Sequence, residues 1–208
     1  MTTTTFKRAA MALALVGSVA LPFAAQAQAQ EGPWLVRLRA VYLDSANKDN
    51  TDLGANLTIN NRWIPELDIS YFFTPNIAAE LVLTYPQKQT VYSNGTEIGS
   101  FKHLPPTLTV QYHFTGIQGF RPYVGAGLNY TNISSVDLLG GGANLKRNSY
   151  GLAAQIGADV PLGNGWLLNV DVKKVQIKTD VLVGATEDNH GSFKVDPWLI
   201  GVGFGKRF

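Results

Sequence analysis

The chain has no cysteine, few charged residues and no long apolar segment beyond its start. The absence of cysteine in 208 residues excludes a disulfide scaffold, a cysteine-ligated metal centre and a thiol nucleophile. Charged residues make up 15% of the chain and aromatic residues 11%, which does not fit a disordered protein. After the first 25 residues, no stretch stays apolar for the roughly 18 positions that a membrane-spanning helix needs. The sequence therefore indicates a folded protein that is not a helical membrane protein.

Residues 1–29 have the pattern of a secretory signal peptide. Lys7 and Arg8 precede an apolar run over 9–23, and residues 25–29 offer two overlapping small-x-small cleavage sites. Cleavage is predicted near residue 27 or 29. A membrane-anchoring helix is the weaker interpretation, because the run is short and contains Pro22. Without the leader, 15 basic residues (17 − 2) face 15 acidic residues, so the charge gives no argument for nucleic acid as a partner.

Residues 30–208 form one predicted domain, in which apolar and polar residues alternate with a period of two. The first such segment places Trp34, Val36, Leu38, Ala40 and Tyr42 on one face. The eight apolar faces fall within 34–42, 63–73, 77–85, 104–114, 120–130, 150–160, 166–172 and 198–204. A period of two predicts β-strands, and about ten residues suffice to cross a bilayer at the tilt of a barrel.

The connections between these strands alternate in length. Short turns are predicted at 74–76, 115–119 and 161–165. Long connections rich in Asn, Gly, Ser and Asp cover 44–61, 87–102, 132–148 and 179–194. Outer-membrane barrels have short periplasmic turns and long extracellular loops, so this alternation predicts both the barrel and its orientation.

Aromatic residues mark both ends of the apolar faces. Those at the turn ends are Trp34, Phe73, Phe114, Phe120, Trp166 and Phe208, and those at the loop ends are Tyr42, Trp63, Tyr85, Tyr130, Tyr150 and Trp198. Two such rings are typical of a membrane barrel, whereas a soluble eight-stranded barrel would have its apolar residues inside and needs no rings. The predicted fold is all-β: an eight-stranded antiparallel up-and-down transmembrane β-barrel of the bacterial outer membrane.

Four segments resemble the OmpW (outer membrane protein W) family, which includes alkane-uptake porins. They are residues 66–74 (ELDISYFFT), 103–114 (HLPPTLTVQYHF), 121–127 (RPYVGAG) and 201–208 (GVGFGKRF). The resemblance implies a narrow outer-membrane barrel that passes small hydrophobic molecules. It also implies recognition by the barrel assembly machinery through the terminal Phe208. Lys206 departs from the family pattern, which more often has an aromatic residue there.

The residues expected to point inward form two layers. Near the loops they are apolar: Val41, Leu43, Ile64, Pro105, Val175, Ile177, Val195, Pro197 and Leu199. Lower down they include a predicted plug of Arg37, Arg39, Glu66, Asp68, Glu80, Arg121, Asp159, Asp171 and Lys173, with Arg207 below it. This lower set has five basic and five acidic residues, and an eight-stranded interior has room only for its own side chains. We therefore expect interlocked ion pairs rather than an aqueous pore.

The two layers predict a channel for small hydrophobic solutes. Val41, Leu43, Ile64, Leu199, Val175 and Ile177 would line an apolar funnel, and the plug would seal the periplasmic end. A sideways exit into the bilayer needs a gap in the strand ladder, and Pro65, Pro105 and Pro106 are candidates because proline has no N–H to donate. The same prolines are also compatible with simple strand ends at the rim. The alternative function is a non-transporting structural or receptor-type barrel that acts through its extracellular loops.

The apolar outward face of 166–172 is followed by charged and polar residues. After Val172, Lys174, Gln176 and Lys178 continue the outward face, which indicates either a strand passing above the hydrocarbon or a bulge. Outward lysines there could meet lipopolysaccharide, so the expected partners are outer-membrane lipids, lipopolysaccharide and small hydrophobic solutes.

The histidines do not suggest a metal site or an enzyme. His103, His113 and His190 lie in different segments without metal-binding spacing, so no metal and no cofactor are expected. His103 with Ser100 or Thr107 is the one conceivable catalytic group at the rim, and no carboxylate supports it. The chain is therefore expected not to be an enzyme.

Overall fold

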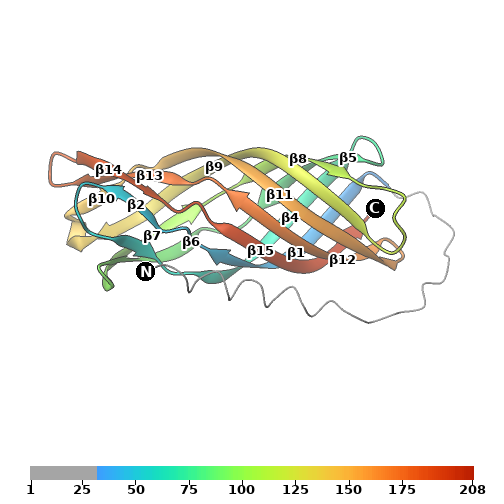
Figure 1. Cartoon of the computed structure of the whole chain (residues 1–208), viewed down its shortest axis with the longest axis horizontal. Helices are drawn as coiled ribbons and strands as arrows, with labels where there is room; N and C mark the ends of the chain where they lie inside the picture. Colours follow the sequence, from blue (N-terminus) through green and yellow to red (C-terminus); the bar gives the residue numbers. More distant parts are fainter. Residues whose placement is uncertain (1–31) are drawn as a thin grey trace, which may run out of the picture.

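The computed structural model describes residues 32–208; the predicted signal peptide and its cleavage site lie outside the described residues. Within that range, eight long antiparallel strands close into one barrel (Figure 1). They are β1 (Trp34–Asp44), β4 (Arg62–Phe72), β5 (Ile77–Leu83), β8 (Thr107–His113), β9 (Arg121–Leu138), β11 (Asn148–Gly163), β12 (Trp166–Val175) and β15 (Trp198–Arg207). Consecutive strands pair with each other, and β1 also pairs with β15, which closes the barrel. The predicted fold class is confirmed.

The alternation of the sequence corresponds to the two faces of this sheet. In β1, residues 35, 37, 39, 41 and 43 are buried in the interior, while Leu38 on the other face is 63% exposed. The aromatic residues predicted at both ends of the apolar faces point outward. Trp63 in β4 and Phe73, one residue past the other end of β4, are each more than 60% exposed. An apolar outer surface bounded by aromatic rings is suited to hydrocarbon with an interface on each side.

The turns at one end are short, as predicted. The turn between β11 and β12 is narrower than the predicted 161–165, because β11 continues to Gly163 through a register shift after Pro161. Asn164 and Gly165 both have positive φ (52° and 78°). This is the combination that a two-residue hairpin turn requires, and Asn-Gly tolerates it at little cost.

At the other end, the predicted long loops are largely strands. They contain β2 (Lys48–Thr51), β3 (Leu57–Ile59), β6 (Gln87–Ser93), β7 (Thr96–Leu104), β10 (Ala143–Leu145), β13 (Lys178–Val183) and β14 (Asp188–Lys194), and a 3₁₀ turn, η1 (Leu139–Gly141), within the predicted connection 132–148. Together with the outer part of β9 they continue the barrel past the aromatic residues at the loop ends, which we call the upper aromatic ring (Figure 1). We call this part of the structure the outer extension.

One seam of the outer extension is joined by side chains instead of a backbone ladder. Between β2 and β3, the amide of Asn47 accepts from Ile59 N at 2.8 Å and donates to Ile59 O at 3.3 Å. One carboxylate oxygen of Asp49 accepts from Leu57 N at 2.8 Å. These bonds take the place of ladder bonds, so the extension surrounds an interior of its own.

The change of pattern in β12 is not a bulge. Residues 167, 169, 171, 173, 175 and 177 are all buried, and β12 pairs with β15 without a register shift. The alternation in space is continuous, and only the chemistry of the two faces changes above Val172. Among residues 32–208, no helix has the length and hydrophobicity needed to span a membrane.

Candidate functional site

The six residues predicted to line a funnel lie inside the barrel and belong to one apolar cluster. Their exposed fractions are between 1% and 8%. They are Val41, Leu43, Ile64, Val175, Ile177 and Leu199. Val41 of β1 is the Cα partner of Ile64 of β4, and Leu43 of β1 is the Cα partner of Leu199 of β15. Four of the six residues therefore come from three adjacent strands.

Two layers below Val41 of this cluster, Arg37 is fully buried and bound on three sides. Its Nη2 and Nε donate to the two oxygens of Asp159 at 2.6 and 3.1 Å. Its Nη1 donates to Glu80 Oε2 at 2.9 Å and to Ser70 Oγ at 3.0 Å. A two-pronged contact of this kind fixes the orientation of the guanidinium as well as its position.

Arg39 lies one layer above Arg37 and joins the remaining carboxylates. Its Nε is 2.6 Å from Asp68 Oδ2, its Nη2 is 3.1 Å from Glu66 Oε1, and its Nη1 is 3.4 Å from Asp171 Oδ1. Lys173 reaches the same Glu66 oxygen at 3.2 Å. The structure therefore brings eight of the nine predicted plug residues into one buried network. The ninth, Arg121, is partly exposed and opposite Asp159 on the ladder.

The plug also contains neutral side chains, which the predicted set of charged residues did not include. Tyr123, fully buried, donates its hydroxyl hydrogen to Asp171 Oδ2 at 2.9 Å. Asn169 Nδ2 donates to the Tyr123 hydroxyl at 3.1 Å and to Asp159 Oδ1 at 2.8 Å. Gln155 Nε2 donates to Glu80 Oε1 at 3.1 Å. Their inward positions were readable from the alternation, but a search for charges passes over tyrosine and amides.

Gly157 provides the space for the Tyr123 ring. A Cβ at residue 157 would lie 2.4 Å from the ring and hydroxyl of Tyr123 and 2.7 Å from the backbone oxygen of Val170, so part of the cost remains when the ring is removed. We expect Gly157→Ala to displace Tyr123 from Asp171 and to lower the free energy of unfolding by roughly 1–3 kcal/mol, the usual cost of overpacking. Urea unfolding in micelles measures this effect. A penalty of the same size in a Tyr123→Ala background would contradict the assignment.

Above the plug lies a small cavity of about 20 Å³, the inner pocket. Glu66 and Lys173 form its charged floor, and Leu43, Ile64, Val175, Ile177 and Leu199 are part of its apolar wall. Val41 packs in the same cluster without lining the pocket. Thr84, Gln87, Pro105 and Thr107 form another part of the wall, where the barrel ladder is interrupted.

We call this interruption the wall gap. It lies between the segment where β5 continues into β6 and the segment where β7 continues into β8. The ladder ends at the pair Val82–Thr107 and resumes at Gln87–His103, so residues 83–86 and 104–106 are outside it. Pro105 and Pro106, two predicted gate residues, lie in the gap, together with Pro86, which the prediction did not include. None of the three has an N–H to donate.

The gap extends to the neighbouring strand. The β4–β5 ladder ends at Leu67–Leu83, and the third predicted gate residue, Pro65, lies on β4 beyond that point. Here Thr84 Oγ1 donates to Pro65 O at 2.9 Å. Gln87 Nε2 donates to Thr84 Oγ1 at 2.9 Å and to Tyr85 O at 2.8 Å. Of these three bonds, the one from Thr84 to Pro65 joins β4 to the residues after β5, so this part of the wall is held by a side-chain bond in place of ladder bonds.

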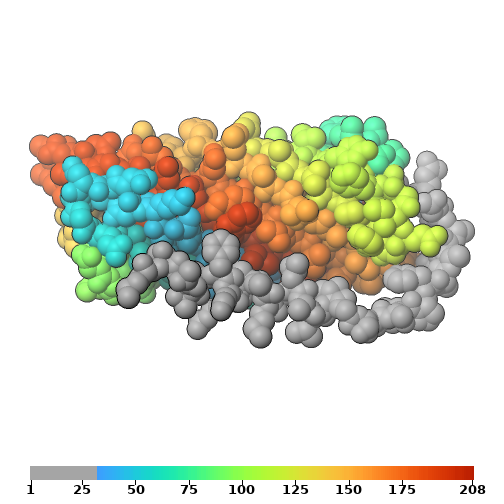
Figure 2. Space-filling model, in the orientation of Figure 1, coloured from blue at the N-terminus to red at the C-terminus, as the bar shows by residue number. Residues whose placement is uncertain are grey.

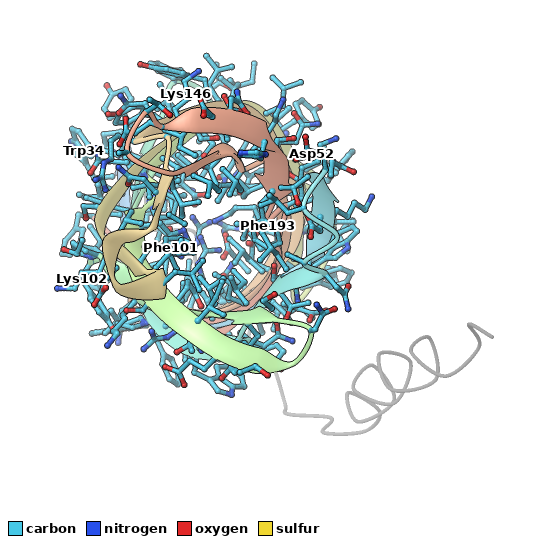
Figure 3. The ribbon with its side chains drawn as sticks, turned by 90° about the vertical axis from the view of Figure 1, so that its left-hand side faces the viewer. Trp34, Asp52, Phe101, Lys102, Lys146 and Phe193 are labelled. Atoms are coloured by element: carbon cyan, nitrogen blue, oxygen red, sulfur yellow. The ribbon has the colours of Figure 1, made fainter. Side chains whose placement is uncertain are left out.

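A second and larger cavity of about 100 Å³, the outer pocket, lies within the outer extension and shares no lining residue with the inner pocket. Its lining is apolar except for Ser93, whose hydroxyl donates to Ala55 O at 2.9 Å. Phe101 and Phe193, 1% and 3% exposed, are part of its lining. Figure 3 looks along the barrel from this end and shows both rings inside the circle of strands.

His103 faces the inner pocket from β7, above the ring of aromatic residues at the loop ends. Burial lowers the pKa of His103 to about 4, and the positive charge of Arg62 acts in the same direction, so the ring is neutral at pH 7. Its Nε2 is 3.2 Å from the amide nitrogen of Gln89, and within residues 32–208 its Nδ1 has no hydrogen-bond partner. The structure therefore forms no hydrogen bond between His103 and Ser100 or Thr107. No group of three or more His, Cys, Asp or Glu residues that could hold a metal occurs in the described part of the chain.

Comparison with known proteins gives consistent matches. An outer-membrane protein of Sinorhizobium fredii, y4mB, described as uncharacterized, is 42% identical over 85% of this chain and 80% of its own length. Outer membrane protein W of Vibrio cholerae is 34% identical over 86% of this chain and 90% of its own. The crystal structure of the outer membrane protein OprG from Pseudomonas aeruginosa superposes with a TM-score of 0.74 at 28% identity, covering 88% of this chain and 99% of OprG.

These relatives and the barrel architecture locate the protein in the outer membrane of a Gram-negative bacterium. The family model described as the OmpW family matches residues 30–208, essentially the whole predicted barrel. The chain therefore belongs to the OmpW family.

Proposed function

We propose that this barrel takes up small hydrophobic molecules and releases them sideways into the outer membrane. The observation that carries the proposal is the position of the inner pocket, which has the charged plug as its floor and the wall gap in its side. A solute that enters from the loop end loses contact with water at both pockets. Removal of apolar surface from water contributes about 25 cal/mol per Å².

The plug makes passage through the barrel floor unfavourable. A neutral solute that moved past Arg39 would separate its guanidinium from Asp68 and Glu66, which are 2.6 and 3.1 Å away. Leaving buried charges unpaired costs several kcal/mol, more than a small apolar solute regains. The wall gap is a cheaper route, because the ladder is interrupted there between residues 83–86 and 104–106, and at the neighbouring seam a side-chain bond from Thr84 to Pro65 O takes the place of ladder bonds.

The direct test is uptake of a radiolabelled small hydrocarbon into the outer membrane of cells with and without the protein, with a hydrophilic sugar as the control. We expect faster uptake of the hydrocarbon and unchanged uptake of the sugar. No difference for either compound would refute transport and favour a structural or receptor-type barrel. Faster uptake of both would refute the sealed plug.

Charged substitutions in the inner pocket are expected to abolish hydrocarbon uptake. Leu43→Asp and Ile64→Lys each place a charge on the apolar wall, and a hydrocarbon cannot compensate it. Heat-modifiable migration on a gel checks that the barrel still folds. Leu43→Met and Ile64→Val are the matched controls and are expected to retain uptake. Normal uptake by both charged variants would exclude these residues from the solute path.

A further inference from the structure

Three lysines on neighbouring strands of the outer extension occupy one rung of the ladder. Lys178 of β13 is the Cα partner of Lys194 of β14, and Lys194 is the partner of Lys48 of β2. Directly opposed residues project from the same face of a sheet with Cβ atoms about 4.5–5.5 Å apart. Lys48 and Lys178 are exposed, and Lys194 is partly exposed. We call these three residues the lysine row.

Such a row destabilises the free protein. Like charges directly opposite one another repel, and an antiparallel pair normally avoids them. The ion pairs of the described residues include none of the three ammonium groups. The row therefore has an unbalanced positive charge that folding alone does not require.

The nearby carboxylates already have other partners. Asp180 is paired with Lys146 at 3.4 Å. Asp196 Oδ1 accepts from Ile177 N at 2.9 Å, and Asp44 Oδ1 accepts from Asn61 Nδ2 at 2.6 Å. One further cation, Lys174, lies below the row over the ring of Trp198. With no ion pair from these carboxylates to the row, its chemistry fits an external anion.

The distance of the lysine row from the upper aromatic ring indicates which layer of the membrane surface it faces. Trp198 belongs to the upper aromatic ring, and Lys194 precedes it by four residues. At about 3.3 Å per residue, the row lies at most roughly 13 Å beyond the ring. Figure 2 shows β13 and β14 (red-orange) beside β2 (cyan) on the surface at the left-hand end of the barrel. The row thus faces the phosphate and sugar layer outside the hydrocarbon.

We propose that the lysine row is a binding site for the phosphate groups of lipopolysaccharide in the outer leaflet. Three ammonium groups on three adjacent strands span about 10 Å, and each forms charge-assisted hydrogen bonds with phosphate oxygens. A second like-charged pair, Lys88 opposite Lys102 on β6 and β7, lies three residues beyond the aromatic Tyr85. Its comparable height fits a layer of anions around the barrel. The bound glycolipid neutralises the repulsion within the row and holds the outer extension upright in the lipopolysaccharide layer.

The test uses the folded barrel in phosphatidylcholine nanodiscs, with fluorescent rough lipopolysaccharide and its dephosphorylated form as probes. We expect the phosphorylated probe to bind at least roughly tenfold more tightly. The triple variant Lys48→Gln, Lys178→Gln, Lys194→Gln is expected to lose that difference. The corresponding triple arginine variant and Lys146→Gln are expected to keep it. Equal binding of the two probes, or wild-type binding by the triple glutamine variant, would overturn the proposal.

Thermal unfolding in a neutral detergent separates binding from folding. Without lipopolysaccharide, the triple glutamine variant should melt at or above the wild-type temperature, because the repulsion is gone. Added lipopolysaccharide should raise the melting temperature of the wild type more than that of the variant. If inorganic phosphate at equal concentration protected the wild type equally well, the row would be a site for free phosphate instead and the proposal would be wrong. This test is independent of hydrocarbon uptake.

Discussion

A disulfide across the outer edge of the wall gap is expected to reduce hydrocarbon uptake at least roughly tenfold, which corresponds to about 1.4 kcal/mol on the exit barrier. Gln87 and His103 are Cα partners where the ladder resumes above the gap. Opposed residues of an antiparallel pair lie at a Cα separation that a disulfide can span. The chain contains no other cysteine, so Gln87→Cys with His103→Cys would form one defined cross-link.

Reduction is the internal control for this experiment. Gln87 donates to Thr84 and Tyr85 on its own side of the gap, so its loss adds no bond across the gap and the reduced double variant should take up hydrocarbon at least as fast as the wild type. A cross-link between the ladder partners Val110 and Ala126, in a closed part of the wall, should have no effect in either state. If oxidation left uptake by the Gln87→Cys, His103→Cys variant unchanged, the exit would have to lie elsewhere.

Loss of Arg39 is expected to be the most destabilising single change in the barrel. Arg39→Met leaves the buried carboxylates of Glu66, Asp68 and Asp171 without the guanidinium that they contact. Removal of one partner of a buried ion pair typically costs about 3–5 kcal/mol of unfolding free energy. Urea unfolding in micelles, followed by tryptophan fluorescence, measures the loss.

Two comparisons define the cause of that loss. Lys146→Met breaks the partly exposed pair with Asp180 and should change the unfolding free energy by at most about 1 kcal/mol. Addition of Asp68→Leu to Arg39→Met should recover part of the stability, because it removes a carboxylate that is fully buried. Equal losses for Arg39→Met and Lys146→Met would show that the plug does not hold the barrel together.

The spanning strands and their faces could be predicted because they depend on local information. A period of two assigns each side chain to the lumen or the lipid without reference to any other strand. Arg37, Arg39 and Lys173 were thereby placed inside, and Trp63 and Phe73 outside, before any pairing was known. The two-layer division of the lumen followed from position along the strand alone.

The outer extension was not predictable in the same way. The segments over 44–61, 87–102, 132–148 and 179–194 contain turn residues that shorten every alternating run, so each was interpreted as a loop. Phe101 and Phe193 line one pocket although they are far apart in the chain. The pairing that brings their strands into one extension depends on register between distant segments, which no short sequence window contains.

The partners within the site were also decided by the tertiary structure. Arg37 and Asp159 are separated by 122 positions, and only barrel closure and register make them neighbours. The prolines at 65, 105 and 106 were identified as breaks because proline lacks an N–H. The wall gap, however, is defined by register, because Pro86, Pro105 and Pro106 all lie between the ladder pairs Val82–Thr107 and Gln87–His103. The sequence by itself determined the strands, their two faces and the orientation, since these follow from residue type and local period. The tertiary structure decided which charges pair, where the ladder of the wall is interrupted and which lysines share a rung, since these depend on the register between strands.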